Sequence, residues 1–224
     1  MRLAIIGFLL VGLTAPALAI DKAEVDKRIH LLTAKFEEMQ AKPDKRIPAE
    51  NLRKAQGLIM LDRIKAGFVF AYQGGGGLAM VRDAKSGRWS SPAFLVANEA
   101  SLGFQIGGQQ AFTVILVMKT NATRALTESS IDFGGEASGT AGNSSGAAES
   151  TTSSDSKPLL MVYNDATGLY GGATIKGGAL APDADANVAY YGQYLTPSEI
   201  LFGQQGKPTE ATTNLVQRIA QFSQ

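Results

Sequence analysis

The sequence predicts an α+β fold, in which a β-rich barrel-like or sandwich core is flanked by N-terminal helices and closed by a C-terminal helix. Apolar residues recur with helical spacing over residues 21–40 and again over 209–222, which indicates a helix near each end. Between Lys65 and Lys119, apolar runs of strand length alternate with glycine-rich breaks. This succession is typical of a β-meander, so the strands are expected to form one core with the helices outside it.

The first 19 residues have the pattern of a secretory signal peptide. Arg2 supplies a positive charge, residues 3–13 are apolar, and the Ala-Leu-Ala at 17–19 is a small-residue cleavage site. The apolar stretch is shorter than the roughly 20 residues that a membrane-spanning helix needs. We therefore expect cleavage after Ala19.

The expected export indicates the compartment of the protein and the bounds of its mature chain. The sequence contains no cysteine, so an exported chain of this kind uses no disulfides, and a bacterial periplasm is the expected location. The mature chain is expected to contain an N-terminal helical segment, 20–46, and one domain, 47–224. A chain of this length is sufficient to bury one sizeable core.

Residues 21–40 are expected to form an amphipathic helix with one apolar stripe. The stripe residues follow spacings of four, three, four and three: Val25, Ile29, Leu32, Phe36 and Met39. The other faces carry four cations, Lys22, Lys27, Arg28 and Lys35. One interpretation is a helix on a membrane surface, with these cations on anionic head groups. A helix docked on the domain, or a short coiled-coil seam, is favoured because neighbouring acidic residues nearly cancel the cations.

Strands are expected where branched and aromatic residues run between breaks. Glycines 74–77 are interpreted as a turn between strands 67–72 and 78–82, in preference to an anion-binding loop, because a strand and not a helix follows. Residues 83–87 are expected to form a second turn. The apolar run 112–118 suits a strand that is buried on both faces. Two further strands are expected at 159–163 and 169–175.

Boundary signals place the remaining helices. Pro48 is expected to open a short helix that ends before Gly57. Residues 121–128 suit one or two helical turns, and Thr196–Glu199 is a capping box that opens a short helix. The terminal helix, 209–222, is expected to turn three side chains to the core: Leu215, Ile219 and Phe222.

Several short motifs follow one another in a distinctive order. They are Gly74–Gly77 before an apolar strand, Trp89-Ser90-Ser91-Pro92-Ala93, Ser101–Gly108, Tyr163–Gly172 and Asn187–Gly192. Their order and spacing resemble the SYLF domain, over roughly residues 47–203. That family binds lipids, and its fungal members also bind actin. The resemblance implies binding of membrane phospholipid, whereas actin is not expected as a partner in a periplasm.

The resemblance also bears on residues 134–157, which are almost all small. Composition alone favours a flexible loop, because such side chains bury too little area to offset the entropy of ordering. SYLF domains carry an extended small-residue segment here. We therefore expect residues 133–142 to be ordered and 144–157 to be mobile. The sequence leaves open whether the segment lines a cavity.

Catalysis, metal binding and nucleic-acid binding are not expected, and no cofactor is implied. The sole histidine, His30, has no orienting partner, and without cysteine the usual zinc ligands are lacking. Asp183–Asn187 begins like a calcium loop, but Val188 and Tyr194 stand where glycine and glutamate are required, so a loop or turn is favoured. With 21 basic and 20 acidic side chains, the chain lacks the basic excess of nucleic-acid binders.

Two functions remain open. The first is a non-enzymatic phospholipid-binding protein of the bacterial cell envelope, which meets an anionic membrane through the four helix cations. Arg88 and Trp89 are then a second site, although core packing explains Trp89 equally well. The second is a structural or interaction module, in which the apolar stripe of the first helix mediates self-association or docks a partner.

Overall fold

The structure of the protein is a computed structural model. It describes residues 20–67, 70–102, 107–129, 131–132, 150–152, 158–168 and 179–224. The signal-peptide pattern, the strand expected at 169–175 and most of the small-residue segment 134–157 lie outside these residues.

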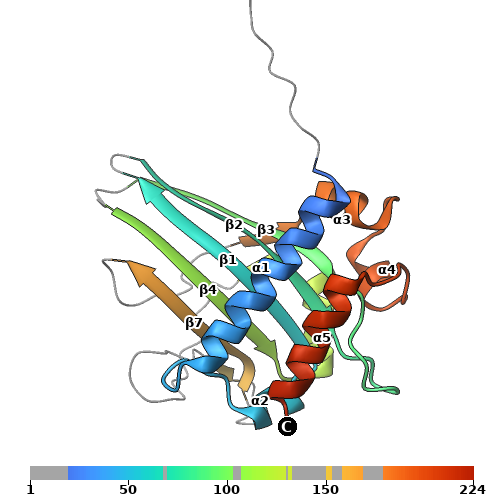
Figure 1. Cartoon of the computed structure of the whole chain (residues 1–224). Helices are drawn as coiled ribbons and strands as arrows, with labels where there is room; N and C mark the ends of the chain where they lie inside the picture. The colour runs from blue at the N-terminus through green and yellow to red at the C-terminus, as the bar shows by residue number, and fades with distance from the viewer. Residues whose placement is uncertain are drawn as a thin grey trace, which may run out of the picture.

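An antiparallel sheet forms the centre of the molecule (Figure 1). In the described part of the chain its strand order is β5-β8-β3-β2-β1-β4-β7-β6. The strands are β1 (Gly57–Gly67), β2 (Phe70–Val81), β3 (Ala93–Leu102), β4 (Gly107–Val117), β5 (Ile131–Asp132), β6 (Ser150–Thr152), β7 (Pro158–Gly168) and β8 (Ala179–Pro182). The central strand, β1, pairs with β2 on one side and with β4 on the other.

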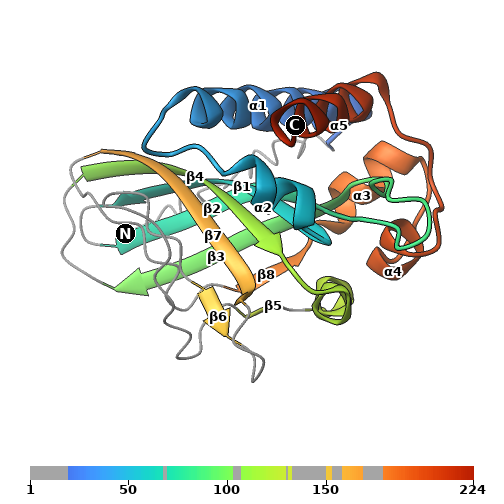
Figure 2. The same ribbon diagram turned by 90° about the horizontal axis from the view of Figure 1, so that it is seen from below.

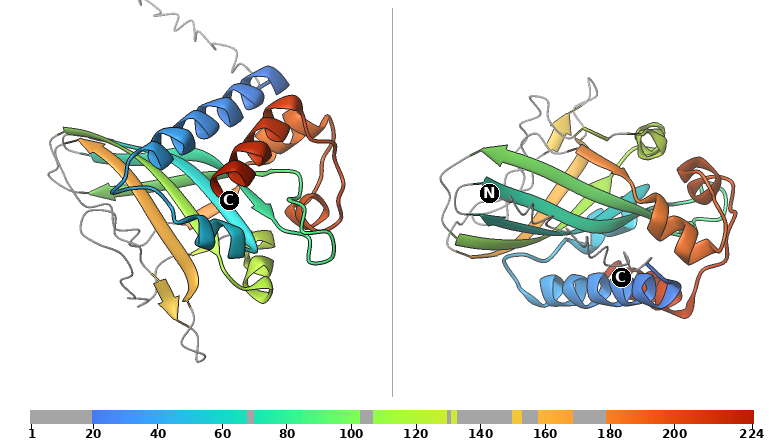
Figure 3. Two further views of the ribbon diagram at one scale, coloured as in Figure 1. Left: turned by 60° about the horizontal axis from the view of Figure 1, so that its bottom comes forward. Right: turned by 90° about the horizontal axis from the view of Figure 1, so that it is seen from above.

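The helices lie outside this sheet. They are α1 (Lys22–Ala41), α2 (Ala49–Lys54), the 3₁₀ helix η1 (Thr120–Thr127), α3 (Ala184–Tyr191), α4 (Pro197–Leu201) and α5 (Glu210–Phe222). Helices α1 and α5 lie side by side on one face of the sheet, so the molecule has a helical layer on a β layer (Figures 2 and 3). The α+β class is thus confirmed.

The sheet is not closed as a barrel. Among the described residues, β5 pairs with β8 and β6 with β7, and the two end strands do not pair with each other. The barrel-like closure that the sequence allowed is therefore wrong, whereas the β-rich core with helices at both ends of the chain is confirmed. Because α1 and α5 cover one face of the sheet, its apolar side chains are buried there without a second sheet or a closed barrel.

Two apolar clusters lie on the two faces of the sheet. Side chains alternate along a strand, so Leu58 and Met60 of β1 join the cluster beneath α1 and α5, while Ile59 and Leu61 join the other one. In β4, Val114 and Leu116 face the helices and Ile115 and Val117 face the opposite side. This confirms that the 112–118 run is a strand buried on both faces.

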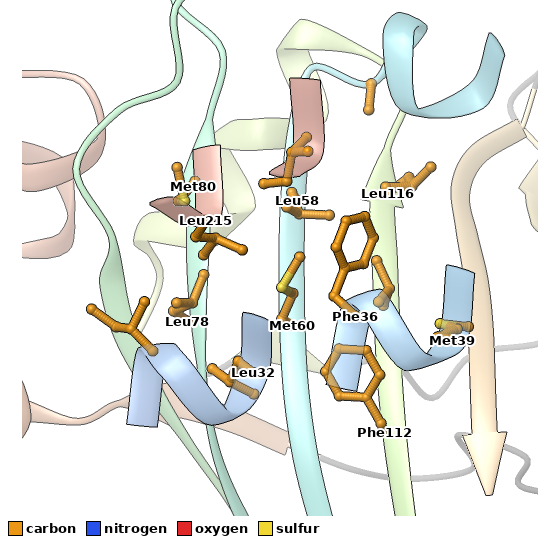
Figure 4. Packing of buried hydrophobic residues seen from close by; sticks show 14 of the residues in the cluster. Leu32, Phe36, Met39, Leu58, Met60, Leu78, Met80, Phe112, Leu116 and Leu215 are labelled. Atoms are coloured by element: carbon orange, nitrogen blue, oxygen red, sulfur yellow. The ribbon is translucent and has the colours of Figure 1, made fainter. Parts of the chain in front are cut away.

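Helix α1 docks on the sheet through its apolar stripe, as the favoured interpretation held. All five stripe residues are fully buried. Figure 4 shows Leu32, Phe36 and Met39 packed over Met60 and Phe112 of the sheet. Burying such a side chain contributes about 1.5–3 kcal/mol. Asp21 caps the helix by accepting a hydrogen bond from the Glu24 N–H at 2.8 Å, and His30 is exposed on its outer side.

The glycines at 74–77 are not a turn, which corrects the expectation from the sequence. They lie inside β2, where Gly75 and Gly77 pair with β1 on one side and β3 on the other. These positions are glycine because neighbouring atoms of α1 and β1 lie too close to leave room for a side chain. A Cβ on Gly76 would lie 3.3 Å from the Arg28 guanidinium of α1, and a Cβ on Gly77 would lie 2.1 Å from the Met60 carbonyl oxygen. Glycine is needed here for space, since only Gly87, Gly192 and Gly206 among the described glycines have positive φ.

The segment that begins like a calcium loop is the start of helix α3, neither a loop nor a turn. The Asp183 carboxylate accepts a hydrogen bond from the Ala186 N–H at 3.1 Å and so caps the helix. The Asn187 side chain accepts from Phe94 N–H at 2.9 Å and donates to Phe94 O at 3.1 Å, which fastens α3 to β3. The regularly spaced oxygens therefore cap and anchor a helix.

Most other boundary signals are confirmed. The turn at 83–87 forms, η1 occupies the segment expected to hold one or two helical turns, and α4 opens with the complete capping box of Thr196 and Glu199. In α5, Leu215 and Ile219 are buried and Phe222 is half-buried against the same cluster. Helix α2 begins one residue later than expected, because Pro48 takes the N-cap position.

The connection from α4 to α5 is pressed onto Tyr191 of α3. Gly206 has φ +88°, and a Cβ there would lie 2.3 Å from the Tyr191 ring. The Ser91 hydroxyl donates to Gly206 O at 3.1 Å, and the Tyr191 hydroxyl donates to Pro92 O at 2.6 Å. Burial raises the pKa of Tyr191. These contacts hold the connection against the segment between β2 and β3.

We predict that Gly77→Ala destabilises the chain by about 3 kcal/mol, because the new methyl group meets backbone that cannot move without breaking the sheet. Gly76→Ala is the matched control, since its methyl group meets only the flexible end of Arg28. Urea unfolding followed by circular dichroism measures both free energies. Equal losses would contradict this explanation of the glycine run.

We also predict that Gly206→Ala destabilises the chain by more than Gly87→Ala. Both glycines have positive φ, and a side chain in that region costs about 1–2 kcal/mol. At Gly87 nothing lies within 4 Å of the added Cβ, whereas at Gly206 the Tyr191 ring must move. Thermal unfolding of the two variants tests the difference, and an equal shift in Tm would show that the contact with Tyr191 has no energetic weight.

Candidate anion-binding cleft

The structure places the four predicted cations of α1 in different surroundings. Arg28 Nη1 lies 2.7 Å from Asp183 Oδ2 of α3's N-cap, and Lys35 Nζ lies 2.6 Å from Asp62 Oδ1 of β1. Both ion pairs are largely shielded from solvent, with side-chain exposures of 13–24%. They fasten α1 to the body of the molecule.

The other two α1 cations are exposed. Lys27 pairs with Glu24 at 3.2 Å on the helix surface, and Lys22 Nζ lies 5.6 Å from the centre of the Tyr190 ring. None of the four α1 cations lines the cleft at the end of the sheet that contains Arg88 and Trp89. The α1 cations thus do not come together with Arg88 and Trp89.

Arg88 and Trp89 line a cleft of about 960 Å³ at one end of the sheet. Its walls come from the β2–β3 connection, from α2 and η1, from the α4–α5 connection and from α5. These segments gather at the end of the sheet where β1 begins and β4 ends (Figures 1 and 2). The cleft is therefore built from five separate stretches of the chain.

Four arginines line this cleft: Arg53 of α2, Arg82 and Arg88 of the β2–β3 connection, and Arg124 of η1. Within the part of the chain that the structure describes, no carboxylate pairs with any of them. The one acidic lining residue, Asp83, accepts hydrogen bonds from the Ser86 N–H at 2.7 Å and from the Ser86 hydroxyl at 2.7 Å. These bonds lower the pKa of Asp83 and hold its carboxylate in the turn. Positive charge therefore predominates in the cleft.

Arg82 is the structural member of the group. Its guanidinium donates to Ala55 O at 3.0 Å, to Leu52 O at 3.4 Å and to Gly87 O at 3.3 Å. The first two carbonyls belong to the end of α2, where a helix leaves carbonyls without intrahelical partners. Burial lowers the pKa of Arg82. The same guanidinium stacks 4.5 Å from the centre of the Trp89 ring and so holds the ring in place.

The other three guanidinium groups are exposed and keep most of their donors. Arg53 donates one hydrogen bond, to Ser223 O at 3.1 Å, and Arg124 stacks 4.3 Å from the centre of the Phe202 ring. Arg88 extends from the hairpin turn. A guanidinium presents a planar fork of donors that matches the oxygens of phosphate or carboxylate. The three groups can therefore bind an anion directly.

The floor of the cleft is apolar and joins the two cores. Val81 and Leu201 are buried there, and Trp89, Phe202 and Val216 are half-buried. Trp89 and Val216 pack against the cluster beneath α1 and α5, whereas Phe202 packs against the cluster on the opposite face. Trp89 thus packs against the core and also lines a surface cleft, while its contact with lipid stays a prediction.

Sequence reasoning found two of these cleft residues and missed three. Arg88 and Trp89 stood out because they are adjacent and the tryptophan is unique. Arg53, Arg82 and Arg124 carry no local motif, and nothing in the sequence signals that they share a cleft. No described helix is long and apolar enough to cross a membrane, and the described residues contain no cluster of histidine and acidic side chains able to hold a metal ion.

Comparison with known proteins places the chain. Residues 98–222, more than half of it, match the family described as Ysc84, Las17-binding protein actin regulator. SH3 domain-containing YSC84-like protein 1 of Xenopus laevis is 34% identical over 171 residues, which are 75% of this chain and 51% of that protein. The Homo sapiens protein of the same name is 30% identical over 193 residues, covering 85% and 56%.

LAS seventeen-binding protein 3 of Saccharomyces cerevisiae (strain ATCC 204508 / S288c) is 29% identical over 201 residues, covering 88% of this chain and 44% of that protein. The chain thus spans about half the length of these relatives, of which the yeast protein is named for binding LAS seventeen. No solved structure matches it. The motifs and the family match agree, and the chain belongs to the Ysc84 family of SYLF domains.

Proposed function

We propose that this chain is a non-enzymatic binding protein of the bacterial cell envelope, exported to the periplasm, that recognises anionic membrane phospholipid at the arginine-lined cleft. The observation that carries the proposal is the set of exposed guanidinium groups of Arg53, Arg88 and Arg124 above an apolar floor, with no carboxylate partner among the described residues. The signal-peptide pattern supports the location.

The chemistry of the cleft suits a phospholipid surface. Phosphate oxygens accept paired hydrogen bonds from guanidinium, and Trp89 offers a ring that is apolar on its body and polar at its N–H. Each Lys or Arg near an anionic membrane contributes about 1 kcal/mol, and the attraction is screened within about 8–10 Å at moderate ionic strength. Arg53, Arg88 and Arg124 together therefore contribute about 3 kcal/mol of attraction to an anionic membrane, and apolar contacts of the cleft must add to it.

The proposed site is the cleft and not the α1 cations of the sequence-based hypothesis. Using Arg28 or Lys35 for head groups would leave Asp183 or Asp62 without its cation in a largely shielded position. Removing one partner from a buried pair is strongly destabilising, by about 3–5 kcal/mol at full burial. Lys22 and Lys27 are exposed and can add only long-range attraction.

A second candidate is an interaction module with a protein partner. The family description, Las17-binding protein actin regulator, favours it. The apolar stripe of α1 is not a ready surface for this purpose, because all five of its side chains are already buried on the chain's own sheet. Self-association or partner docking through that stripe would first require α1 to leave the sheet. Actin remains an unexpected partner for a periplasmic protein.

We predict that Arg88→Gln with Arg124→Gln lowers affinity for anionic vesicles about 30-fold, because two contributions of about 1 kcal/mol are lost. Lys22→Gln with Lys27→Gln is the matched control, since it removes two exposed charges from α1, and it should change affinity less than threefold. Co-sedimentation of residues 20–224 with phosphatidylcholine vesicles, with and without phosphatidylglycerol, at low and high salt measures both. Binding should require phosphatidylglycerol and weaken with salt.

Two outcomes would overturn parts of this proposal. If the α1 double variant loses as much affinity as the cleft double variant, the cleft is not the site. If the folded protein does not pellet with any vesicle at low salt, phospholipid binding itself is wrong and a protein partner becomes the better account.

A further inference from the structure

The cleft is larger than contact with a head group requires. Its volume is about 960 Å³, at the upper end of the roughly 300–1,000 Å³ of pockets that enclose small molecules. A phosphate group occupies only a few times the about 30 Å³ of one water molecule. A head group alone would therefore leave most of the cleft empty.

The lining has two zones with different chemistry. Arg53, Arg88 and Arg124 are exposed and form the rim. The accessible part of the floor is apolar and consists of three half-buried side chains, Trp89, Phe202 and Val216. An ion without a hydrocarbon part would leave the apolar floor in contact with water. A purely apolar ligand would leave the rim without a counter-charge. A ligand that satisfies both zones carries an anionic group at one end and hydrocarbon at the other.

We infer that the cleft holds a single anionic phospholipid molecule, with its phosphate at the arginine rim and hydrocarbon against the floor. The inference rests on the proposed function and deepens it, because surface adhesion needs only the rim. The floor is held in place before a ligand arrives. The Arg82 guanidinium stacks on the ring of Trp89, and the Arg124 guanidinium stacks on the ring of Phe202. A pre-organised floor loses little freedom when a chain is bound against it.

The chain offers a direct reporter for this inference. Trp89 is the only tryptophan and lines the cleft, so its fluorescence responds to a ligand on the floor. Residues 20–224 are titrated with dihexanoyl phosphatidylglycerol below its micelle concentration, where no membrane surface exists. Dihexanoyl phosphatidylcholine and glycerol 3-phosphate serve as the neutral lipid and as the head group without chains.

A saturable change in Trp89 fluorescence with one phosphatidylglycerol per chain is expected, at least tenfold weaker with phosphatidylcholine and absent with glycerol 3-phosphate. Shortening the acyl chains from hexanoyl to butyryl should weaken binding about fourfold for each methylene that leaves the floor, the equivalent of about 0.8 kcal/mol. Calorimetry gives the stoichiometry independently of the tryptophan.

A variant that blocks access to the floor separates the two zones. Ala220 is an exposed residue of α5 that lines the cleft, and Ala220→Phe should abolish binding of the short-chain lipid while vesicle binding at the rim persists. Gln221→Phe, on the same helix outside the cleft lining, is the matched control and should bind like the unchanged chain. Val216→Phe provides a second block, on the floor itself. Circular dichroism confirms that each variant folds.

The failure of this inference is distinct from the failure of the proposed function. If glycerol 3-phosphate binds as well as the lipid, the cleft is an anion site only and the inference is wrong. If vesicles pellet the protein but no saturable signal appears below the micelle concentration, the contact is confined to the membrane surface and the inference is again wrong. If neither vesicles nor short-chain lipid bind, both proposals fall.

Discussion

The packing of α1 across the sheet is the interaction on which the rest of the structure depends. The helix buries its apolar stripe against β1 and its neighbours, and the glycines of β2 leave room for Arg28 to reach Asp183 beside Gly76. A bulky side chain at Gly76 would occupy the space that the Arg28 guanidinium takes in this ion pair. Because α1 already covers this face, the sheet is buried there without closing into a barrel.

The position of α1 in turn sets the position of α5, and α5 forms one wall of the cleft. Phe36 of α1 meets Phe222 edge to face at 5.7 Å, and Arg218 of α5 pairs with Glu37 at 2.6 Å. At the start of α5, the Thr209 hydroxyl donates to Asp26 of α1 at 2.7 Å. A continuous set of contacts thus runs from the N-terminal helix to the cleft lining at Val216.

The distribution of charge separates cations that hold the fold together from cations that the fold leaves unpaired among the described residues. On α1, Arg28 and Lys35 face aspartates of other elements, so their charge holds the fold together. Around the cleft, Arg82 is engaged by backbone carbonyls, while Arg88 and Arg124 are exposed and Arg124 stacks on the Phe202 ring. An arginine that the fold does not neutralise is the kind of group that an anionic ligand can use. The cleft, and not helix α1, is therefore the proposed binding site.

The sequence by itself determined the α+β class, the family and those elements whose signals are local, such as the α1 stripe, the Thr196 capping box and the buried run of β4. Periodicity and capping act within a few residues, so they can be read from the order of the chain. Only the tertiary structure decided that the glycines of β2 lie within a strand, since a close approach by another element leaves no mark on the glycines themselves. The cleft, too, was decided only by the tertiary structure. Arg53, Arg82 and Arg124 come from separate elements, and a guanidinium's partner is set by which segments fold against it.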